Sequence, residues 1–143
     1  MSVERTFVDT NILLYAYDPR DEARHRAAVA VLRELWEARA GVLSVQVMQE
    51  FAVNARRRLP APLPSEQIAA ILSTYRVWPI HRPELDDVLA AVDLQDRARI
   101  SFWDAMILVA ARRLGATRVY SEDLNAGQIF DGVRVINPLA LGA

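Results

Sequence analysis

Short apolar runs alternate with longer amphipathic stretches along most of this chain of 143 residues. The short runs are predicted strands: Thr6–Val8, Gly41–Ser44, Arg118–Tyr120 and Val133–Ile136. Strands separated by helices are joined by right-handed crossovers, which place the strands parallel in one sheet with helices on both faces. The alternation therefore predicts an α/β fold with a short, mainly parallel central sheet. The length predicts a single domain spanning residues 1–143.

The longer stretches carry apolar residues at helical spacing. In Asp21–Arg39, apolar residues recur at i, i+3 and i+4, which indicates a helix with one buried stripe. The other predicted helices are a short one beginning at Ile12, then Val45–Arg58, Ser65–Thr74 with Ser65 as N-cap, a helix from Pro83 through Arg97, and Ser101–Leu114. The proline-rich segment Leu59–Pro64 predicts a loop, and Tyr75–Ile80 an extended segment.

The composition excludes several classes of site. The chain has no cysteine, so disulfide scaffolds, zinc sites with cysteine ligands and thiol nucleophiles are ruled out. All 17 basic residues are arginine, and without lysine there can be no P-loop and no Schiff-base chemistry. Only His25 and His81 are present, which excludes a histidine-rich metal site. The net charge of −1 gives no global positive field toward nucleic acid, although a local basic face is compatible with it.

The first residues, Met1–Arg5, lack the charged-then-apolar layout of a signal peptide. The sequence also contains no apolar run approaching the roughly 18 residues that a bilayer-spanning helix needs. We therefore expect a cytoplasmic protein that does not contact a membrane.

Four acidic residues stand where a parallel sheet would gather them. Asp9 follows the first predicted strand, and Asp123 follows Arg118–Tyr120 with Glu122 beside it. Asp104 lies in the first turn of a predicted helix, and Glu50 lies within another. In such folds ligands bind at the carboxyl ends of the strands, where the strand order reverses. We expect these four side chains to meet there.

Each acid also has an ordinary structural explanation. Asp9 would cap the helix that follows it, and Asp104 would complete a capping box with Ser101. Glu122 and Asp123 would be solvated loop residues. Glu50 would pair with residues one turn along its helix. Taken singly, these explanations compete with a functional role.

Taken together, the acids favour a metal site. Two like charges about 4 Å apart repel by roughly 4 kcal/mol at an effective dielectric constant of 20, so a pocket of carboxylates needs protons or a cation. Because the chain has no lysine, a hard divalent ion is the available neutraliser. Oxygen ligands suit Mg²⁺, with Mn²⁺ as an alternative. One or two such ions assist the hydrolysis of a phosphodiester.

Four segments in order carry a resemblance to a known family. They are Val8–Leu13, Glu50 in a helix after a short strand, Ser101–Ile107 and Tyr120–Leu124. Together they resemble the PIN domain, and in particular the toxin nuclease of bacterial VapBC-type toxin–antitoxin pairs, over Phe7 to Pro138. The resemblance implies a PIN-like three-layer α/β/α fold and a Mg²⁺-dependent endoribonuclease. It also implies a homodimer silenced by a small cognate antitoxin protein.

The resemblance assigns roles to individual positions. Asp9, Glu50, Asp104 and Asp123 match the acidic residues of the family, with Asp9 and Asp104 as the metal ligands. Glu50 and Asp123 would orient the attacking water or complete a second ion site. Asn11 matches the position whose amide helps to order Asp9, and Ser101 matches the small hydroxyl residue ahead of Asp104. Asp123 fits the pattern better than its neighbour Glu122.

An acidic pocket needs basic groups around it to hold RNA. The candidates are Arg56, Arg57 and Arg58 at the end of the Glu50 helix, with Arg112 and Arg113 as a second choice. The three tryptophans are expected in the core or an interface rather than stacked on bases. Two other functions stay open: a metal-dependent DNA nuclease, and a catalytically silent PIN-like module acting through protein contacts.

Overall fold

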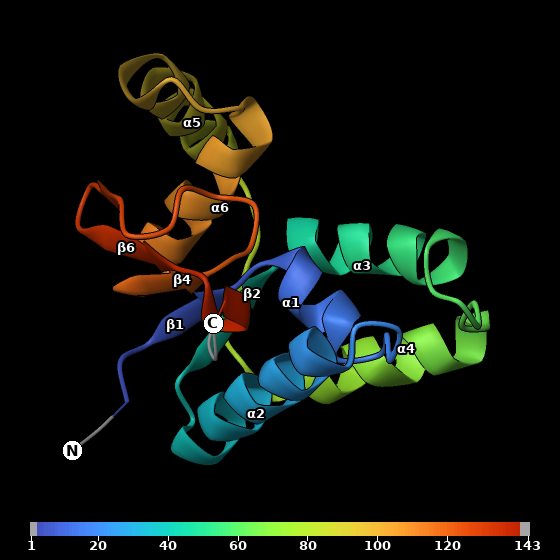
Figure 1. Ribbon diagram of the computed structural model, residues 1–143. Coiled ribbons are helices and arrows are strands. Elements are labelled where there is room, and N and C mark those ends of the chain that lie inside the picture. Colours follow the sequence, from blue (N-terminus) through green and yellow to red (C-terminus); the bar gives the residue numbers. More distant parts are fainter. Residues whose placement is uncertain (1–2, 141–143) are drawn as a thin grey trace.

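A six-stranded sheet forms the centre of the molecule (Figure 1). The computed structural model describes residues 3–140. The strands are β1 (Thr6–Val8), β2 (Gly41–Ser44), β3 (Ile80–His81), β4 (Arg118–Tyr120), β5 (Ile129–Phe130) and β6 (Val133–Ile136), in the order β3-β2-β1-β4-β6-β5. All neighbouring pairs are parallel except β5 and β6. The predicted α/β fold with a mainly parallel sheet is confirmed.

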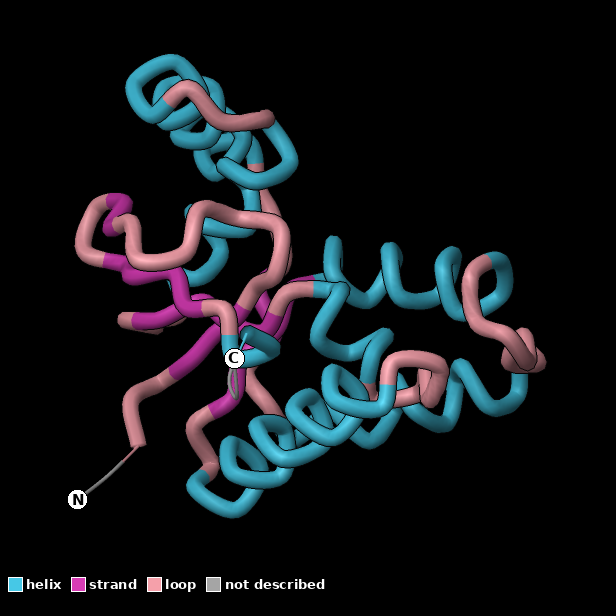
Figure 2. Tube along the Cα trace, in the orientation of Figure 1, coloured by secondary structure: helices cyan, strands magenta, loops and turns pink. Residues whose placement is uncertain are grey.

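Helices lie on both sides of the sheet, as Figure 2 shows. They are α1 (Thr10–Tyr15), α2 (Glu22–Ala38), α3 (Val45–Arg57), α4 (Ser65–Thr74), α5 (Leu85–Ala98) and α6 (Phe102–Arg113), with short 3-10 turns η1 (Tyr75–Val77) and η2 (Pro138–Ala140). Helix α6 packs directly on the sheet and α5 packs outside it, whereas α1, α2 and α4 lie on the opposite side. No helix in residues 3–140 combines the length and apolarity that crossing a membrane requires.

The core is built around α6 and the central strands. Every residue of the α6 segment 105–111 is buried, which is the pattern of a helix covered on all sides. The flanking helices bury all of β1 and the last two residues of β4, and in both strands the apolar residues follow one another without alternation after a polar first residue. This rigid centre fixes the carboxyl ends of β1 and β4 relative to α6.

The segment predicted as extended over Tyr75–Ile80 is only partly so. It begins with the turn η1, and strand pairing is limited to Ile80 and His81. The cause is aromatic packing, because the rings of Trp36, Tyr75 and Trp78 contact one another at centroid distances of 4.9–5.6 Å. Gly41 makes room for this cluster, since a Cβ there would lie 2.3 Å from the Trp78 ring.

One predicted N-cap is wrong, two predicted helix starts are shifted, and one strand was missed. Helix α1 begins at Thr10 rather than Ile12, because Asp9 caps it. Helix α4 does begin at Ser65, but its N-cap is Pro64, so the prediction that Ser65 caps it is wrong. Helix α5 begins at Leu85 rather than Pro83, because Glu84 and Asp87 form a capping box. The missed strand β5 pairs with β6 across a tight Asp131-Gly132 turn, in which both residues have positive φ.

Candidate active site

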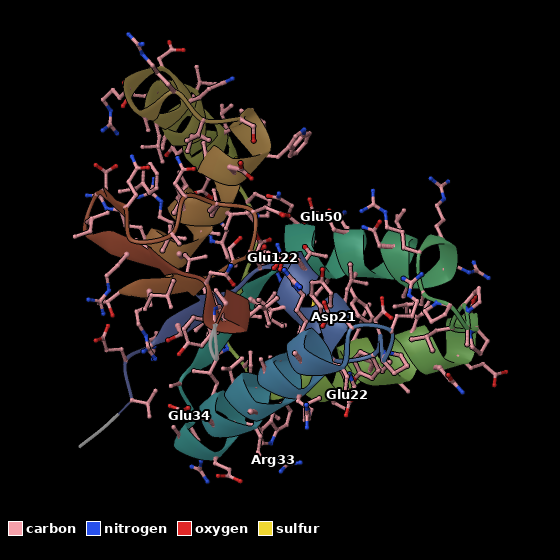
Figure 3. All side chains as sticks on the ribbon, viewed as in Figure 1. Asp21, Glu22, Arg33, Glu34, Glu50 and Glu122 are labelled. Carbon is pink, nitrogen blue, oxygen red and sulfur yellow. The ribbon has the colours of Figure 1, made fainter. Side chains whose placement is uncertain are left out.

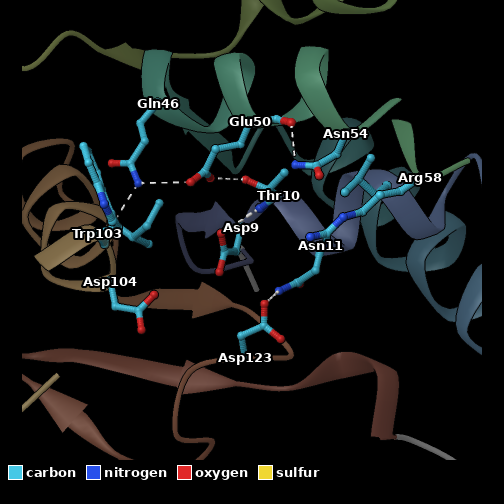
Figure 4. Close-up of a pocket in the computed structure, with 12 residues that line it drawn as sticks. Asp9, Thr10, Asn11, Gln46, Glu50, Asn54, Arg58, Trp103, Asp104 and Asp123 are labelled. Carbon is cyan, nitrogen blue, oxygen red and sulfur yellow. Dashed lines mark hydrogen bonds between the residues drawn. The ribbon is translucent and has the colours of Figure 1, made fainter. Parts of the chain in front are cut away.

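The four predicted acids line one pocket at the carboxyl edge of the sheet (Figure 4). The pocket has a volume of about 200 Å³ and lies where β1 meets β4, the point at which the strand order reverses. Its lining residues are Asp9, Thr10, Asn11, Leu14, Gln46, Glu50, Asn54, Arg58, Trp103, Asp104, Ile107 and Asp123. We call this the acidic pocket. The expectation that these acids share one edge of the sheet therefore agrees with the geometry.

Asp9 forms the floor of the acidic pocket and is 7% exposed. Its carboxylate accepts hydrogen bonds of 2.7 Å from the Thr10 amide and from Ser121 Oγ. It therefore caps α1, as its simpler explanation predicted, while lining the pocket. Burial raises the pKa of Asp9 from 3.8 to about 6; these hydrogen bonds oppose the rise, and the charges of Glu50 and Asp123 add to it.

Glu50 reaches the pocket from α3 and is held by α1. Thr10 Oγ1 donates a 2.5 Å hydrogen bond to Glu50 Oε1, so Thr10 contacts two of the acids through its amide and its hydroxyl. Asn54 donates to the backbone carbonyl of Glu50 rather than to its carboxylate. The Glu50 carboxylate also accepts a 3.5 Å hydrogen bond from Gln46 Nε2, one turn earlier on α3. Its partners are therefore Thr10 and Gln46, rather than the Asn54 and arginine side chains of the simpler explanation.

Asp104 reaches the pocket from the first turn of α6. Ser101 caps this helix by accepting a 3.0 Å hydrogen bond from the Asp104 amide. Within residues 3–140 the reciprocal bond of a capping box, from the Ser101 amide to the Asp104 carboxylate, does not form. The carboxylate faces the pocket instead (Figure 4). The helix N-terminus favours a negative charge there.

The neighbouring acids Glu122 and Asp123 point to different places. Glu122 accepts hydrogen bonds from Tyr15 Oη at 3.1 Å and from Arg24 Nε at 2.6 Å. Arg24 links it to Asp21, and both acids are labelled in Figure 3. Asp123 lines the acidic pocket, where Asn11 Nδ2 donates a 3.0 Å hydrogen bond to it. Asn11 thus orients Asp123 rather than Asp9, which was the expectation, while its Oδ1 accepts a hydrogen bond from the Glu122 amide.

Sequence reasoning missed Ser121, which is fully buried beneath the pocket. Its hydroxyl donates to Asp9 and accepts from the amides of Asp123 and Leu124 at 3.2 and 3.3 Å. It therefore ties the floor of the pocket to the loop that carries Asp123. The available signal was a small hydroxyl residue directly after a strand and two positions before an acid.

The predicted basic residues are not equivalent in the structure. Arg58 lines the acidic pocket, whereas Arg56 and Arg57 lie exposed at the end of α3 outside it. Arg112 and Arg113 lie at the far end of α6 from Asp104. There they pair with Asp131 at 3.6 Å and Asp87 at 2.8 Å.

The donor set of the acidic pocket fits a magnesium ion. Its oxygens come from carboxylates and amides, and the charges acting on the buried Asp9 are those of other carboxylates. Within residues 3–140, no three acidic or histidine side chains are close enough to form a ready-made metal cluster. Mg²⁺ is commonly held by one or two carboxylates together with several waters, and the carboxylate and amide oxygens that line this pocket are ligands of that kind.

Comparison with known proteins places the chain in a family. The profile of the PIN domain matches residues 6–129, which include the whole acidic pocket. The chain belongs to the PIN domain family. No curated protein gives a significant sequence match to this PIN domain.

Solved structures with the same fold are toxins of VapBC-type pairs. The PIN domain is similar to VapC20 of Mycobacterium tuberculosis, a sarcin–ricin loop cleaving toxin, with 24% identity and a TM-score of 0.66, over 90% of this chain and 98% of that one. It is also similar to a chain of a toxin–antitoxin complex from Klebsiella pneumoniae, with 20% identity and a TM-score of 0.65, over 93% and 97% of the chains. A third neighbour belongs to DNA-bound VapBC from Salmonella typhimurium, with 16% identity, a TM-score of 0.62 and coverage of 93% and 97%. At these identities the similarity establishes the fold.

Proposed function

We propose that this PIN domain is a Mg²⁺-dependent endoribonuclease that hydrolyses RNA phosphodiester bonds and acts as the toxin of a toxin–antitoxin pair. The observation that carries the proposal is the acidic pocket, in which Asp9, Glu50, Asp104 and Asp123 converge from four elements. A buried carboxylate surrounded by further carboxylates is unfavourable without a cation. Active sites are where such arrangements are found.

The roles of the residues follow from their positions. Asp9 and Asp104 would hold the ion, which when bound supplies the positive charge that polarises the phosphoryl oxygen and stabilises the leaving oxygen. Glu50 and Asp123 accept hydrogen bonds from the attacking water and orient it. Thr10 and Asn11 hold those two carboxylates in place through the bonds of 2.5 and 3.0 Å. Ser121 keeps Asp9 ionised by donating to it.

The proposal is tested by incubating the purified protein with labelled single-stranded RNA in Mg²⁺, in Mn²⁺ and in EDTA. Asp9→Asn is expected to lower cleavage at least ~100-fold, because it removes a ligand charge without changing volume. A matched variant is Asp93→Asn, on the exposed side of α5, which should cleave like the wild type. Undiminished cleavage by Asp9→Asn would remove Asp9 from the mechanism.

The same assay separates the alternatives. DNA of the same base sequence in parallel reactions distinguishes an RNA nuclease from a DNA nuclease. No cleavage of either polymer in Mg²⁺ or Mn²⁺ would point to a catalytically silent module. Calorimetric titration of Mg²⁺ gives a second readout that does not depend on finding the right substrate.

The toxin role extends the proposal to partners. Solved structures of neighbours contain toxin–antitoxin complexes, which supports a cognate antitoxin protein for this chain. The homodimer stays a prediction. Expression of the wild type should arrest bacterial growth, whereas Asp9→Asn should not. Co-expression of the product of the adjacent reading frame should restore growth, and the two proteins should elute together. Arrest that persists in the Asp9→Asn strain would argue against an enzymatic toxin.

A further inference from the structure

The two ends of the acidic pocket differ in chemistry. Figure 4 shows Trp103 at one end and Arg58 at the other, with the acids between them. One end thus offers an aromatic ring and the other a cation. A nucleotide strand presents both complementary groups, a base and a phosphate.

Trp103 is 61% exposed, unlike the other two tryptophans of the chain. Trp78 is buried, and Trp36, although 42% exposed, packs against Tyr75 and Trp78. The backbone of Trp103 is fixed at the start of α6, and its carbonyl accepts a 3.3 Å hydrogen bond from Gln46. Its indole contacts the ring of Phe102 edge to face at 5.1 Å. An anchored backbone with an exposed ring is suited to stacking on a base.

Arg58 belongs to a stripe that α3 presents to the pocket. Gln46, Glu50, Asn54 and Arg58 follow one another at a spacing of four, and all four line the acidic pocket. Residues four apart are neighbours on one helix face, which explains why Arg56 and Arg57 do not reach it.

The Arg58 side chain is available for a ligand. Its backbone carbonyl accepts a 2.8 Å hydrogen bond from Arg20, while its guanidinium makes no hydrogen bond or ion pair within residues 3–140. Arg58 also lines a second hollow, of about 320 Å³, which shares Asn11, Leu14 and Asp123 with the acidic pocket. A nucleotide strand that extends from the acidic pocket toward Arg58 therefore has space to continue.

We propose that a single RNA strand crosses the acidic pocket with one base stacked on Trp103 and a phosphate on the far side bound by Arg58. The phosphodiester to be cut then lies over the acids between them. This inference rests on the proposed nuclease function, since it names how that substrate is held. It requires unpaired RNA, because a base inside a duplex is stacked on its neighbours and cannot lie on an indole ring.

The test measures binding without cleavage. In the Asp9→Asn background with Mg²⁺, fluorescence anisotropy compares the affinity of a labelled single-stranded oligoribonucleotide with that of its duplex. Trp103→Ala should weaken single-strand binding about 5- to 100-fold, and Trp103→Phe should restore most of it. Trp36→Ala is the matched control and should leave the affinity unchanged. Duplex binding should be weak in all variants.

The arginine end is tested by the dependence of affinity on salt. Arg58→Ala should lower the slope of log affinity against log salt by about 0.7, because one phosphate contact is lost from a single strand. Arg56→Ala, on the same helix end outside the pocket, is the control. Trp103→Ala should weaken binding without changing the slope.

The outcomes separate this inference from the proposed function. If the wild type cleaves RNA but Trp103→Ala binds it normally, the stacking site is wrong and the nuclease stands. If Trp103→Ala changes the oligomeric state in gel filtration and leaves RNA affinity intact, the ring is a protein contact, which also overturns the inference. If the wild type cleaves nothing but Trp103 and Arg58 still govern single-strand binding, the nuclease fails and the strand site stands.

Discussion

Two buried aspartates in this molecule have opposite surroundings. Asp9 is 7% exposed and Asp87 is 6% exposed, so burial alone disfavours the charge on both. Around Asp9 the charges are those of Glu50 and Asp123, and its pKa rises to about 6. Burial would also raise the pKa of Asp87, but hydrogen bonds from the Glu84 amide and Arg113 outweigh it and hold the pKa below 3.8.

Asp87 connects three elements within the protein. It accepts from the Glu84 amide at 2.9 Å and from Arg113 Nε at 2.8 Å, and His81 Nε2 lies 3.1 Å from it. It thereby caps α5 and links that helix to α6 and β3. Asp9 has hydrogen-bond donors but no ion pair with a cationic side chain among residues 3–140. The comparison shows that burial alone does not distinguish a functional carboxylate, whereas burial among like charges is typical of functional sites.

The largest effect on folding stability is expected at Asp87, whose charge has cationic partners. Asp87→Asn should lower the free energy of unfolding by about 2–3 kcal/mol at pH 7, because it removes the partner of Arg113 and weakens the cap of α5. The figure lies below that for fully buried pairs because Arg113 is half exposed. Urea denaturation measures it. A loss no larger than that of the exposed Asp93→Asn would break the comparison.

Replacing Asp9, which lies among like charges, should have the opposite effect on stability, and the size of that effect should depend on pH. In EDTA, Asp9→Asn should be more stable than the wild type by about 1–2 kcal/mol at pH 7.5. A pKa rise from 3.8 to about 6 corresponds to roughly 3 kcal/mol. The expected gain is smaller because asparagine has one acceptor oxygen fewer than aspartate. The folded wild type keeps its Asp9 proton up to about pH 6, whereas the unfolded chain releases it near 3.8. The wild type therefore loses stability as pH rises from about 4 to about 6. The advantage of Asp9→Asn should fall to zero near about pH 5, and the wild type should be the more stable protein at about pH 4. Denaturation curves at a series of pH values measure this, and a constant difference would contradict it.

Ser121→Ala should increase the difference between Asp9 and Asp87, because it removes the hydroxyl donor that favours the charged form of Asp9. We expect the free energy of unfolding to fall by about 1 kcal/mol, because one buried amide and one partly buried amide lose their acceptor. Mg²⁺ affinity should fall about tenfold, because Asp9 is then a poorer ligand. Calorimetric titration measures the second effect. Ser121→Thr, which keeps the hydroxyl, is the control, and unchanged Mg²⁺ binding in the alanine variant would contradict a positioning role.

The smallest effect is expected at the acid that points away from the pocket. Glu122→Gln should change stability by less than about 1 kcal/mol, since its pair with Arg24 is partly exposed, and should leave cleavage within about twofold. Asp123→Asn at the next position should impair cleavage clearly more. Initial rates under saturating Mg²⁺ compare the two. Equal losses would mean that the assignment of Asp123 rather than Glu122 is wrong.

The fold class and the meeting of the acids could be predicted because both depend on periodic and positional signals. Parallel strands end at one edge, so residues that follow β1 and β4 must lie close together. The roles of Asp9, Glu50, Asp104 and Asp123 in catalysis stay predictions that await the assays above. The tight turn at Asp131-Gly132 was also readable in the sequence, but the strand before it is only two residues long.

Other features depend on contacts that no local pattern contains. The turn η1 is set by the packing of Tyr75 and Trp78 against Trp36, some 40 residues earlier in the chain. Ser121 has no periodic signal, and its importance appears only when Asp9 is brought to it across the sheet. The exposure of Trp103 likewise follows from where α6 begins, so the expectation of core packing is wrong for this ring, while that of an interface stays untested.

The spacing of four along α3 has a consequence for how this site can diversify. Glu50 and Arg58 are two steps apart on one helix, about 12 Å along its axis. Inserting one residue between them would rotate Arg58 by about 100° around the helix axis. Another side chain would then face the acidic pocket, while Glu50 would stay in place. Under the proposed function, such a change of helix register would alter the side chain that faces the RNA strand without touching the four acidic residues.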